Sequence, residues 1–578
     1  MKFFDSKKFI AGAAVIAAFC CPSCVKTDGT LGQEFIPDSD IWQVGITTFD
    51  LESIEMQKAS ELGGYNSRRI SIGGVNDPEM GWSEREAAFA LIPIADTTDA
   101  LDLGENIEFQ QFHFALAKDT VSFRDASQEN IIQNIRVYEL KKPLDENYIY
   151  AGQSSADLYD EAAGVVTEGI PTYNGGDSLS FNFSAEFGQK YLEALSGMPL
   201  DSVSSYIKRL PGILIKADRP SYGSGRINMF DVAVDVNDYN YITGNYVELK
   251  YRAKFDDRGV IDTSLVFMVG AAEFVAEDSS TLPTQYGFNF SSSEGKIAPS
   301  ASSAENIYIE GGSGLKPVLR AQELKEEVTK AISSKIEGYD SMSDSLKKVA
   351  LSKVVINKAT IKLPFEASGD FSALDYYPET LSPTCRLQGK SVTTSGDTLS
   401  VVSYAGLTDA SVSSENQGTI NRSTLCYEPD VSHHIQELLR LSKKDSESDE
   451  DFAKRESQYD IWMLIMHDEV DETSSSSSSS SYNDYLSALA YSSYYNSLYN
   501  GYGYGGYGYG YGSYGYNSYY NNYYNYMMMA AYASSSSSST TSTSTELDKD
   551  RYYSCKLYGP ASTEKKPTMT ITFSYPKE

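Results

Sequence analysis

The feature that most constrains the fold is a succession of short segments in which apolar and polar residues alternate. Segments such as QVGITTFDLESIEM (43–56), FHFALAKDTVSF (112–123) and YVELKYRAKF (246–255) follow this two-residue period and are rich in β-branched or aromatic residues. A period of two places successive side chains on opposite faces of a strand, and turn residues separate the segments at short intervals. The sequence therefore predicts a mainly β chain built from antiparallel sandwiches.

Only three segments have the apolar spacing of helices. Residues 184–197 begin with Ser184 as a candidate N-cap and end at Gly197. Residues 321–350 contain a run with Leu324, Val328 and Ile332 on one face. Residues 431–444 form the third segment, with Asp430 or Ser432 as its cap. Few helices among many strands strengthen the mainly β interpretation.

The order of these elements repeats along the chain. In each half, two strands are followed by a helix, an apolar strand, another strand and a closing strand. We therefore predict two tandem antiparallel β-sandwich domains, jelly-roll-like, each with one short helix. The expected divisions are a signal peptide (1–23), a tether (24–42), domain 1 (43–256), a connector with strands and a helix at 321–350 (257–352), and domain 2 (353–578) with a low-complexity insertion (471–547).

The N-terminus predicts export and lipid attachment. Lysines precede an eleven-residue apolar segment, Phe9 to Phe19, which is too short to cross a bilayer. The segment CCPSC follows, and a cysteine directly after such a segment indicates a bacterial lipoprotein. Cys24, preceded by the small Ser23, is the expected lipid site; Cys21 is the alternative, and an ordinary secretory signal is a second one. The lipid would hold the protein on a membrane rather than across it.

Charge and cysteine content limit the partners. The formal net charge is −31, and no basic patch is visible, so we expect no nucleic-acid partner because phosphate binding requires Lys or Arg. Beyond the lipid site, Cys385, Cys426 and Cys555 match no zinc spacing. One disulfide or three buried thiols are both compatible with this set.

One stretch departs from the rest of the chain. Residues 500–529 hold twelve tyrosines and no charge, and serine runs flank them on both sides. The internal repeat places this stretch where the first half has only a short turn, so we predict a disordered Tyr/Gly/Ser-rich loop inserted in a β-hairpin. Tyrosine binds through a flat apolar ring and one hydroxyl, so the loop is a candidate partner-binding element; self-association and neutral filler are the alternatives. The central tyrosines are Tyr502, Tyr504, Tyr507, Tyr509, Tyr511, Tyr514 and Tyr516.

Several stretches resemble a family of Bacteroidetes lipoproteins catalogued as domain of unknown function 4270. They include SCVKTDGTLGQEFIP (23–37), IGGVNDPEMGWSEREAAFAL (72–91), IYIEGGSGLKPVL (307–319) and KPTMTITFSYP (566–576), and they occur in the family's order. The resemblance covers about residues 23–470 and 548–578, and the tyrosine insertion is longer than the family pattern needs. It implies a β-rich lipoprotein of the outer envelope, and it transfers no catalytic residue.

A search for chemistry gives no catalytic, cofactor-binding or metal motif. His433 and His434 are adjacent on one helix and therefore point about 100° apart, and His113 and His467 lie in strand patterns. The acidic run DSESDED (445–451) lacks the spacing of a calcium loop and is interpreted as a solvated loop. We therefore expect a non-enzymatic, lipid-anchored outer-membrane protein that binds glycans or envelope proteins, on the periplasmic side or at the cell surface. The alternatives are a glycan hydrolase with paired carboxylates and an accessory subunit of an outer-membrane assembly.

Overall fold

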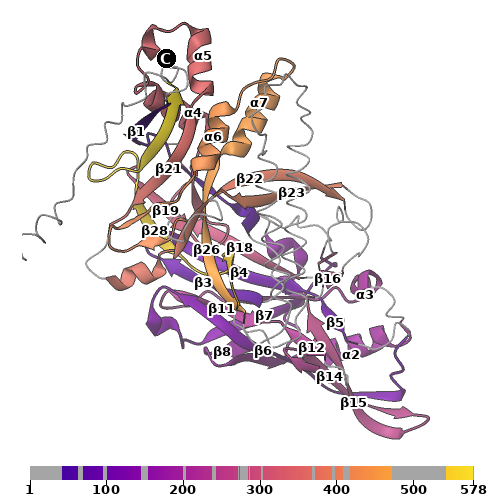
Figure 1. Ribbon diagram of the computed structural model, residues 1–578. Coiled ribbons are helices and arrows are strands. Elements are labelled where there is room, and N and C mark those ends of the chain that lie inside the picture. Colours follow the sequence, from indigo (N-terminus) through magenta and orange to yellow (C-terminus); the bar gives the residue numbers. More distant parts are fainter. Residues whose placement is uncertain are drawn as a thin grey trace, which may run out of the picture.

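The computed structural model places strands and a few short helices over most of the chain (Figure 1). It describes residues 42–576 apart from 63–68, 95–99, 145–153, 199–202, 237–241, 271, 274–283, 286, 301–303, 367–370, 393–397, 408–416 and 472–541. All strand pairs in this part of the chain are antiparallel, and the helices are short. The predicted mainly β fold is confirmed, while the predicted loop around the tyrosines lies outside the described residues.

The first unit comprises residues 69–295 and is built on one large sheet. Its strands, in spatial order, are β5 (Leu91–Pro93), β15 (Gly259–Val269), β14 (Val247–Phe255), β6 (Glu105–Phe123), β11 (Gly225–Asp231), β3 (Arg69–Asp77), β4 (Gly81–Phe89), β10 (Ile213–Ala217), β7 (Gln133–Glu139) and β8 (Thr172–Tyr173). In addition, β18 (Gly287–Gly295) pairs with β4, and β9 (Ser178–Asn182) pairs with β6. Smaller pairs are β12 (Val234–Val236) with β13 (Ile242–Gly244) and β16 (Ala272–Glu273) with β17 (Thr284–Gln285).

The second unit comprises residues 42–58 and 306–576 and contains three sheets. The first holds β2 (Glu55–Lys58), β20 (Leu315–Leu319), β26 (Ile461–Asp471), β22 (Thr380–Val392) and β23 (Thr398–Gly406), with β27 (Ser542–Leu547) beside β26. The second holds β1 (Trp42–Asp50), β29 (Thr568–Pro576), β21 (Val355–Pro364), β25 (Cys426–Tyr427) and β24 (Ile420–Asn421). The third is the pair β19 (Asn306–Glu310) and β28 (Ser554–Tyr558).

The helices lie close to where their sequence patterns predict them. In the first unit α2 (Ala185–Leu195) is capped by the hydroxyl of Ser184, and α3 (Val203–Arg209) follows it. The predicted connector helix is two helices, α4 (Ala321–Ser333) and α5 (Asp344–Ser352). The last two are α6 (Ser432–Arg440) and α7 (Asp449–Glu456). The N-cap position of α6 is held by Val431, which has no side-chain cap, and not by Asp430 or Ser432 as predicted; Asp430, one residue earlier, accepts the amide of Ser432 at 2.9 Å.

Helix α7 corrects the interpretation of the acidic run as a loop. Ser448 accepts the amide of Asp451, and the first turn of α7 contains the last three acids of the run. Carboxylates at a helix N-terminus interact favourably with the helix dipole, which explains why this charged segment is helical. The helix has no buried residue, so its sequence lacks the apolar periodicity by which a helix is usually predicted.

Several strand pairings of the first unit have counterparts in the second. The pair β14–β6 corresponds to β29–β21, and β10 between β7 and β4 corresponds to β26 between β22 and β20. The pair β11–β3 corresponds to β28–β19. Helix α2 packs on β6 as α6 packs on β21. The two halves of the chain therefore share these strand pairings and one helix that packs on the corresponding strand.

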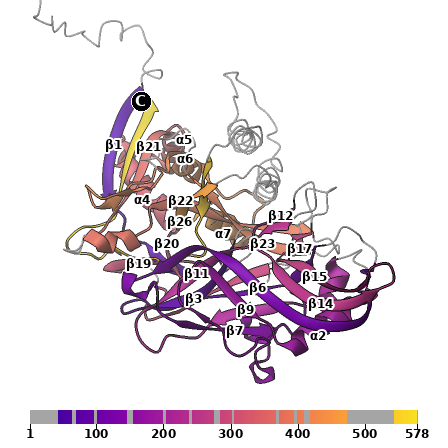
Figure 2. The ribbon, with the colours of Figure 1, turned by 90° about the horizontal axis from the view of Figure 1, so that it is seen from below.

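The division between the units differs from the expected boundaries. Figures 1 and 2 show the indigo strand β1 beside the yellow β29, and β2 likewise pairs with β20. The N-terminal strands thus complete the second unit, whereas β15 and β18 fill the corresponding positions in the first. Residues 43–58 were expected in domain 1, and β15 and β18 in the connector. An alternating pattern identifies a strand but carries little information on its distant partner, which is the physical reason for the difference.

Each unit has its own apolar core. In the first unit an aromatic cluster joins the sheet to α2, with Phe112 and Phe183 ring centroids 4.6 Å apart and Tyr191 packed against Phe112. In the second unit Val328 of α4 and Ile435 of α6 are fully buried in the same cluster as Phe573 of β29. These cores fix the sheets that carry the features described below.

Candidate functional site

The strands β26 and β27 form the base of the tyrosine-rich insertion. Asp471 is the register partner of Ser542, and the pairing continues to Met466 and Leu547. The chain thus leaves and re-enters the sheet at neighbouring positions, which is the hairpin arrangement expected from the repeat. In the first unit the same position, between β10 and β11, holds only residues 218–224. The seven tyrosines from Tyr502 to Tyr516 lie outside the described residues.

The inner half of this hairpin is firmly held. Residues Ile461 to Ile465 of β26 are buried, and exposure increases toward Asp468. Directly after β27, the amide of Asp548 donates to the carbonyl of Ile465 at 3.0 Å. The insertion therefore emerges from a strand that is anchored in the core at one end and reaches solvent at the other.

Asp548 organises the turn that follows the hairpin. Its buried carboxylate accepts the amides of Asp550 and Arg551, the hydroxyl of Tyr553 at 2.7 Å and the guanidinium of Arg551 at 3.0 Å. Burial opposes ionisation of this carboxyl, but the Arg551 charge and the hydrogen bonds outweigh it and lower its pKa. Asp548 is thus a charged anchor for the base of the insertion.

The same turn joins the two units. The Tyr552 hydroxyl donates to Asp77 of β3 at 2.5 Å, and Val75 and Ile227 surround the Tyr552 ring. Burial opposes ionisation of Asp77, but the Tyr552 hydroxyl and the amides of two neighbouring residues hold its pKa below the usual range. Ser71 donates to Asp550 at 2.7 Å. The segment after the insertion therefore connects the hairpin to the sheet of the first unit.

A buried lysine lies beside this connection. Lys316 of β20 is fully buried, and its ammonium donates to the carbonyls of Glu310 at 2.5 Å, Gly312 at 2.8 Å and Gly314 at 3.2 Å. Burial lowers its pKa to about 7, against the opposing charge of Glu310. Arg85 of β4 is also fully buried, and a side chain on Gly312 would collide with its guanidinium. The lysine closes a turn by binding three of its carbonyls.

A separate pocket of about 260 Å³ lies at the N-terminus of α4. Four cations line it: Lys58 of β2, Arg320, Arg386 of β22 and Lys454 of α7. Trp462 forms part of its wall. This concentration of positive charge is notable in a chain of net charge −31, and its chemistry suits an anionic group.

The pocket's lining carboxylate is already engaged. Asp460 is bonded to the guanidinium of Arg320 at 2.6 Å and to the amide of Ala321 at 2.8 Å. Arg320 also contacts Glu55 at 2.6 Å. These contacts fix the shape of the pocket. The charge of Arg320 is therefore shared with two carboxylates.

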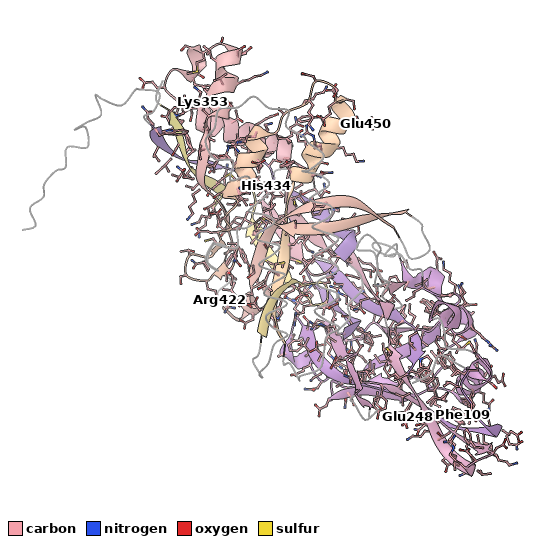
Figure 3. The ribbon with its side chains drawn as sticks, turned by 45° about the vertical axis from the view of Figure 1, so that its right-hand side comes forward. Phe109, Glu248, Lys353, Arg422, His434 and Glu450 are labelled. Carbon is pink, nitrogen blue, oxygen red and sulfur yellow. The ribbon has the colours of Figure 1, made fainter. Side chains whose placement is uncertain are left out.

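The histidines are dispersed rather than clustered. His113 contacts the Asn182 side chain at 2.9 Å within the first unit, whereas His434 belongs to α6 and its buried ring contacts the carbonyl of Tyr459 at 2.8 Å (Figure 3). His467 is on β26 and is half-buried. Among the described residues we find no group of three or more His, Cys, Asp or Glu side chains that could hold a metal ion.

The remaining predicted sites are the cysteines. Cys385, Cys426 and Cys555 are buried and form no disulfide with one another, which leaves the thiol alternative rather than a bridge between them. Burial raises the pKa of Cys426 and Cys555, so both are held as thiols. Cys24 lies outside the described residues. In the part of the chain that is described, no helix is long and apolar enough to span a bilayer.

Comparisons with protein-family models, with curated proteins and with solved structures gave no match to this chain. The basic pocket and the buried junction between the units were both missed by the sequence analysis. Their residues are isolated charges separated by tens to hundreds of positions, so no local pattern could have brought them together. The base of the hairpin, in contrast, could be predicted from the sequence because the two halves of the chain could be compared.

Proposed function

We propose that this protein is a lipid-anchored outer-membrane lipoprotein with a non-catalytic binding role, and that segment 472–541 is its binding element. The observation that carries the proposal is the hairpin β26–β27, which holds both ends of this segment at paired positions. A buried carboxylate and the junction between the two units hold the base of the insertion in place. Such a scaffold is suited to presenting the insertion to a partner. The proposal includes membership of the lipoprotein family that the sequence resembles.

The composition of the segment supports a binding role. Tyrosine provides a large contact surface at a small cost in side-chain entropy, and glycine and serine let the backbone adapt to a partner. Glycans, which stack on aromatic rings, and other envelope proteins are the partners that fit this chemistry at an outer membrane. Membership in a larger outer-membrane assembly is the alternative in which the partner is permanent.

The hydrolase alternative requires two carboxylates facing each other across a groove. The pocket has a single lining carboxylate, Asp460, which is bonded to Arg320 and to the start of α4. A carboxylate in this environment is poorly placed to protonate or attack a glycosidic bond. The geometry of this pocket therefore favours binding over hydrolysis.

The test is affinity capture of the intact lipoprotein after mild detergent extraction, compared with two variants. One replaces residues 472–541 by Asn-Gly, and the other keeps the length but changes the seven tyrosines from Tyr502 to Tyr516 to serine. We expect both variants to lose the same glycan or protein partners. Identical partners for all three proteins would overturn the proposal, and loss in the deletion alone would assign the role to length rather than to tyrosine.

The basic pocket favours a second candidate function, the binding of a small anionic solute. Lys454 and Arg386 would contact its charged group, and Trp462 would limit its size. Titration calorimetry with inorganic phosphate, sulfate and glucuronate should show binding that is lost in Lys454→Gln with Arg386→Gln. The matched control is Lys443→Gln, which removes a cation that pairs with Asp449 and does not line the pocket. Equal heats for the wild type and both variants would exclude this function.

A further inference from the structure

The strand β1 exposes large apolar side chains on one face. Trp42, Val44 and Ile46 occupy alternate positions and are 52%, 66% and 64% exposed. The intervening Gly45 faces inward, where an added side chain would collide with the ring of Phe573. The exposure therefore belongs to one side of the strand and is not a consequence of loose packing.

This apolar strip continues across the sheet. Val44 is the register partner of Ser574, and Ser574 in turn pairs with Val355 of β21, which is 39% exposed. One row further, Ile46 aligns through Thr572 with the exposed Lys358. We call the residues Trp42, Val44, Ile46, Val355 and Lys358 the outer face. It joins three strands and therefore forms a surface rather than a single exposed side chain.

Strand β1 is also the edge of its sheet in the described part of the chain. Edge strands are normally protected by charges, prolines or a covering element, because their free backbone groups recruit other strands. The segment WQVGITTF, from Trp42 to Phe49, contains neither a charge nor a proline. A long, apolar and unprotected edge is expected to be covered by something in the assembled state.

The segment that leads from the end of α4 into β21, and that carries Val355 and Lys358 of the outer face, differs in the sign of its net charge from the whole protein. Residues 335–358 contain five lysines and three acids, a local net charge of +2 in a chain of −31. Lys353 marks this end of the molecule in Figure 3, opposite the end that carries Phe109 and Glu248. Helix α5, which Figures 1 and 2 place at the same end, exposes Leu346 and Val349. Apolar side chains with lysines around them suit an anionic lipid surface.

The position of the predicted anchor selects the occupant. Residues 25–41 join the lipidated Cys24 to Trp42, and this tether spans at most about 60 Å when fully extended. We infer that the outer face rests on the lipid bilayer that holds the N-terminal anchor, with Trp42 at the level of the headgroups, where tryptophan is favoured. This inference rests on the proposed lipid anchor and adds to it the face that the protein turns toward the membrane.

The tryptophans make the inference directly measurable. The chain has three, and Trp82 and Trp462 are 8% and 6% exposed, so Trp42 is the one that a bilayer can reach. The purified lipoprotein is reconstituted into vesicles of phosphatidylethanolamine and phosphatidylglycerol, with and without lipids brominated on their acyl chains. We expect the brominated lipids to quench part of the emission and the membrane-bound protein to show a blue shift. Both effects should be absent from the Trp42→Phe variant.

Two further measurements separate the possible failures. Flotation with the vesicles and intact mass report the anchor itself; a protein that lacks the lipid and does not float contradicts the proposed anchor. A protein that floats but shows no Trp42 quenching overturns the outer-face inference alone. Val44→Glu with Ile46→Glu should float normally and lose the quenching. If native mass measurements instead show a dimer in detergent that these substitutions dissociate, the face binds a second copy and the bilayer inference is wrong.

Discussion

His434 illustrates how burial makes a single side chain respond to pH. Its ring lies on the buried face of α6 beside Tyr459, and burial lowers its pKa to about 4, against the hydrogen bond to the Tyr459 carbonyl. In the unfolded chain the pKa is about 6.5. Between these values the unfolded state binds a proton that the folded state does not. The free energy of unfolding therefore falls as the pH decreases from about 6.5 to 4.

We expect this residue to contribute about 3 kcal/mol of acid destabilisation over that interval, since one pKa unit corresponds to ~1.4 kcal/mol. His434→Gln retains an N–H donor for Tyr459 but cannot be protonated, so its stability should decline less between pH 6.5 and 4. Urea unfolding of both proteins at half-unit steps of pH provides the comparison. Parallel stability curves would show that His434 is protonated without cost in the folded state.

Lys316 makes the free energy of unfolding depend on pH in the alkaline range. Its pKa is about 7 in the folded protein and about 10.4 in an unfolded chain. Above the higher value both states are neutral, and between the two values only the unfolded state is protonated. Stability contributed by this residue therefore rises as the pH increases from about 7 to 10.4, and it is constant below 7.

The substitution Lys316→Met removes this dependence and leaves three carbonyl acceptors unsatisfied. The wild type should gain up to about 4 kcal/mol relative to the variant between pH 7 and 10. Their absolute stabilities at one pH do not test the argument, because the lost hydrogen bonds alter them as well. Denaturant curves at pH 7, 8, 9 and 10 give the slope, and a constant difference would mean that the buried ammonium stays charged.

At the scale of elements, local sequence patterns predicted which segments form helices and strands, but they did not predict which strands pair with each other. Ser184 and the apolar spacing after it located α2 to within two residues, because caps and periodicity are local signals. The partner of β1 lies more than 500 positions away in β29. Nothing in an alternating segment encodes that distance. Helix α7 was missed for the converse reason, because its stabilising carboxylates and cap carry no apolar period.

The candidate site follows the same rule. The hairpin could be located because the first half of the chain provides an internal comparison at residues 218–224. The pocket could not, since Lys58, Arg320, Arg386 and Lys454 come from four elements that only the folded sheets bring together. Residues separated in this way are seen in a sequence as ordinary surface charges.

Asp548 gives a prediction for the hairpin as an element. Removing one partner of a buried ion pair typically costs about 3–5 kcal/mol, because the other charge is left uncompensated. We expect Asp548→Ala to reduce stability by this amount and to release the turn that holds β27. Hydrogen exchange should then increase in β26 and β27 more than in β21.

The matched control is Asp468→Ala in the same hairpin. Its carboxylate is exposed and accepts the Thr545 hydroxyl at 2.6 Å, so its loss should cost less than about 1 kcal/mol. A similar loss of stability in both variants would indicate that position in the hairpin, rather than the buried charge network, determines the effect. Unchanged hydrogen exchange of β26 and β27 in Asp548→Ala would show that Asp548 does not anchor the hairpin.

At the scale of the whole molecule, the repeat is completed by non-local strands. In the first unit β15 and β18, which pair with β14 and β4, come from the chain that follows β14. In the second unit the same positions are taken by β1 and β2, the first described strands of the chain. The chain therefore closes on itself, with its first and last described strands side by side.

A closed scaffold of this kind should not depend on its insertion. Replacing residues 472–541 by Asn-Gly shortens a seventy-residue connection between Asp471 and Ser542 to two residues, and those ends are already paired. The entropy of closing the shorter loop is smaller by about 3 kcal/mol at most, so the deletion should be neutral or stabilising. Asn-Gly is chosen because it favours the turn that joins two antiparallel strands. Calorimetric unfolding of both proteins tests this; a deletion that lowers the midpoint would show that the insertion packs on the scaffold and contributes to its stability.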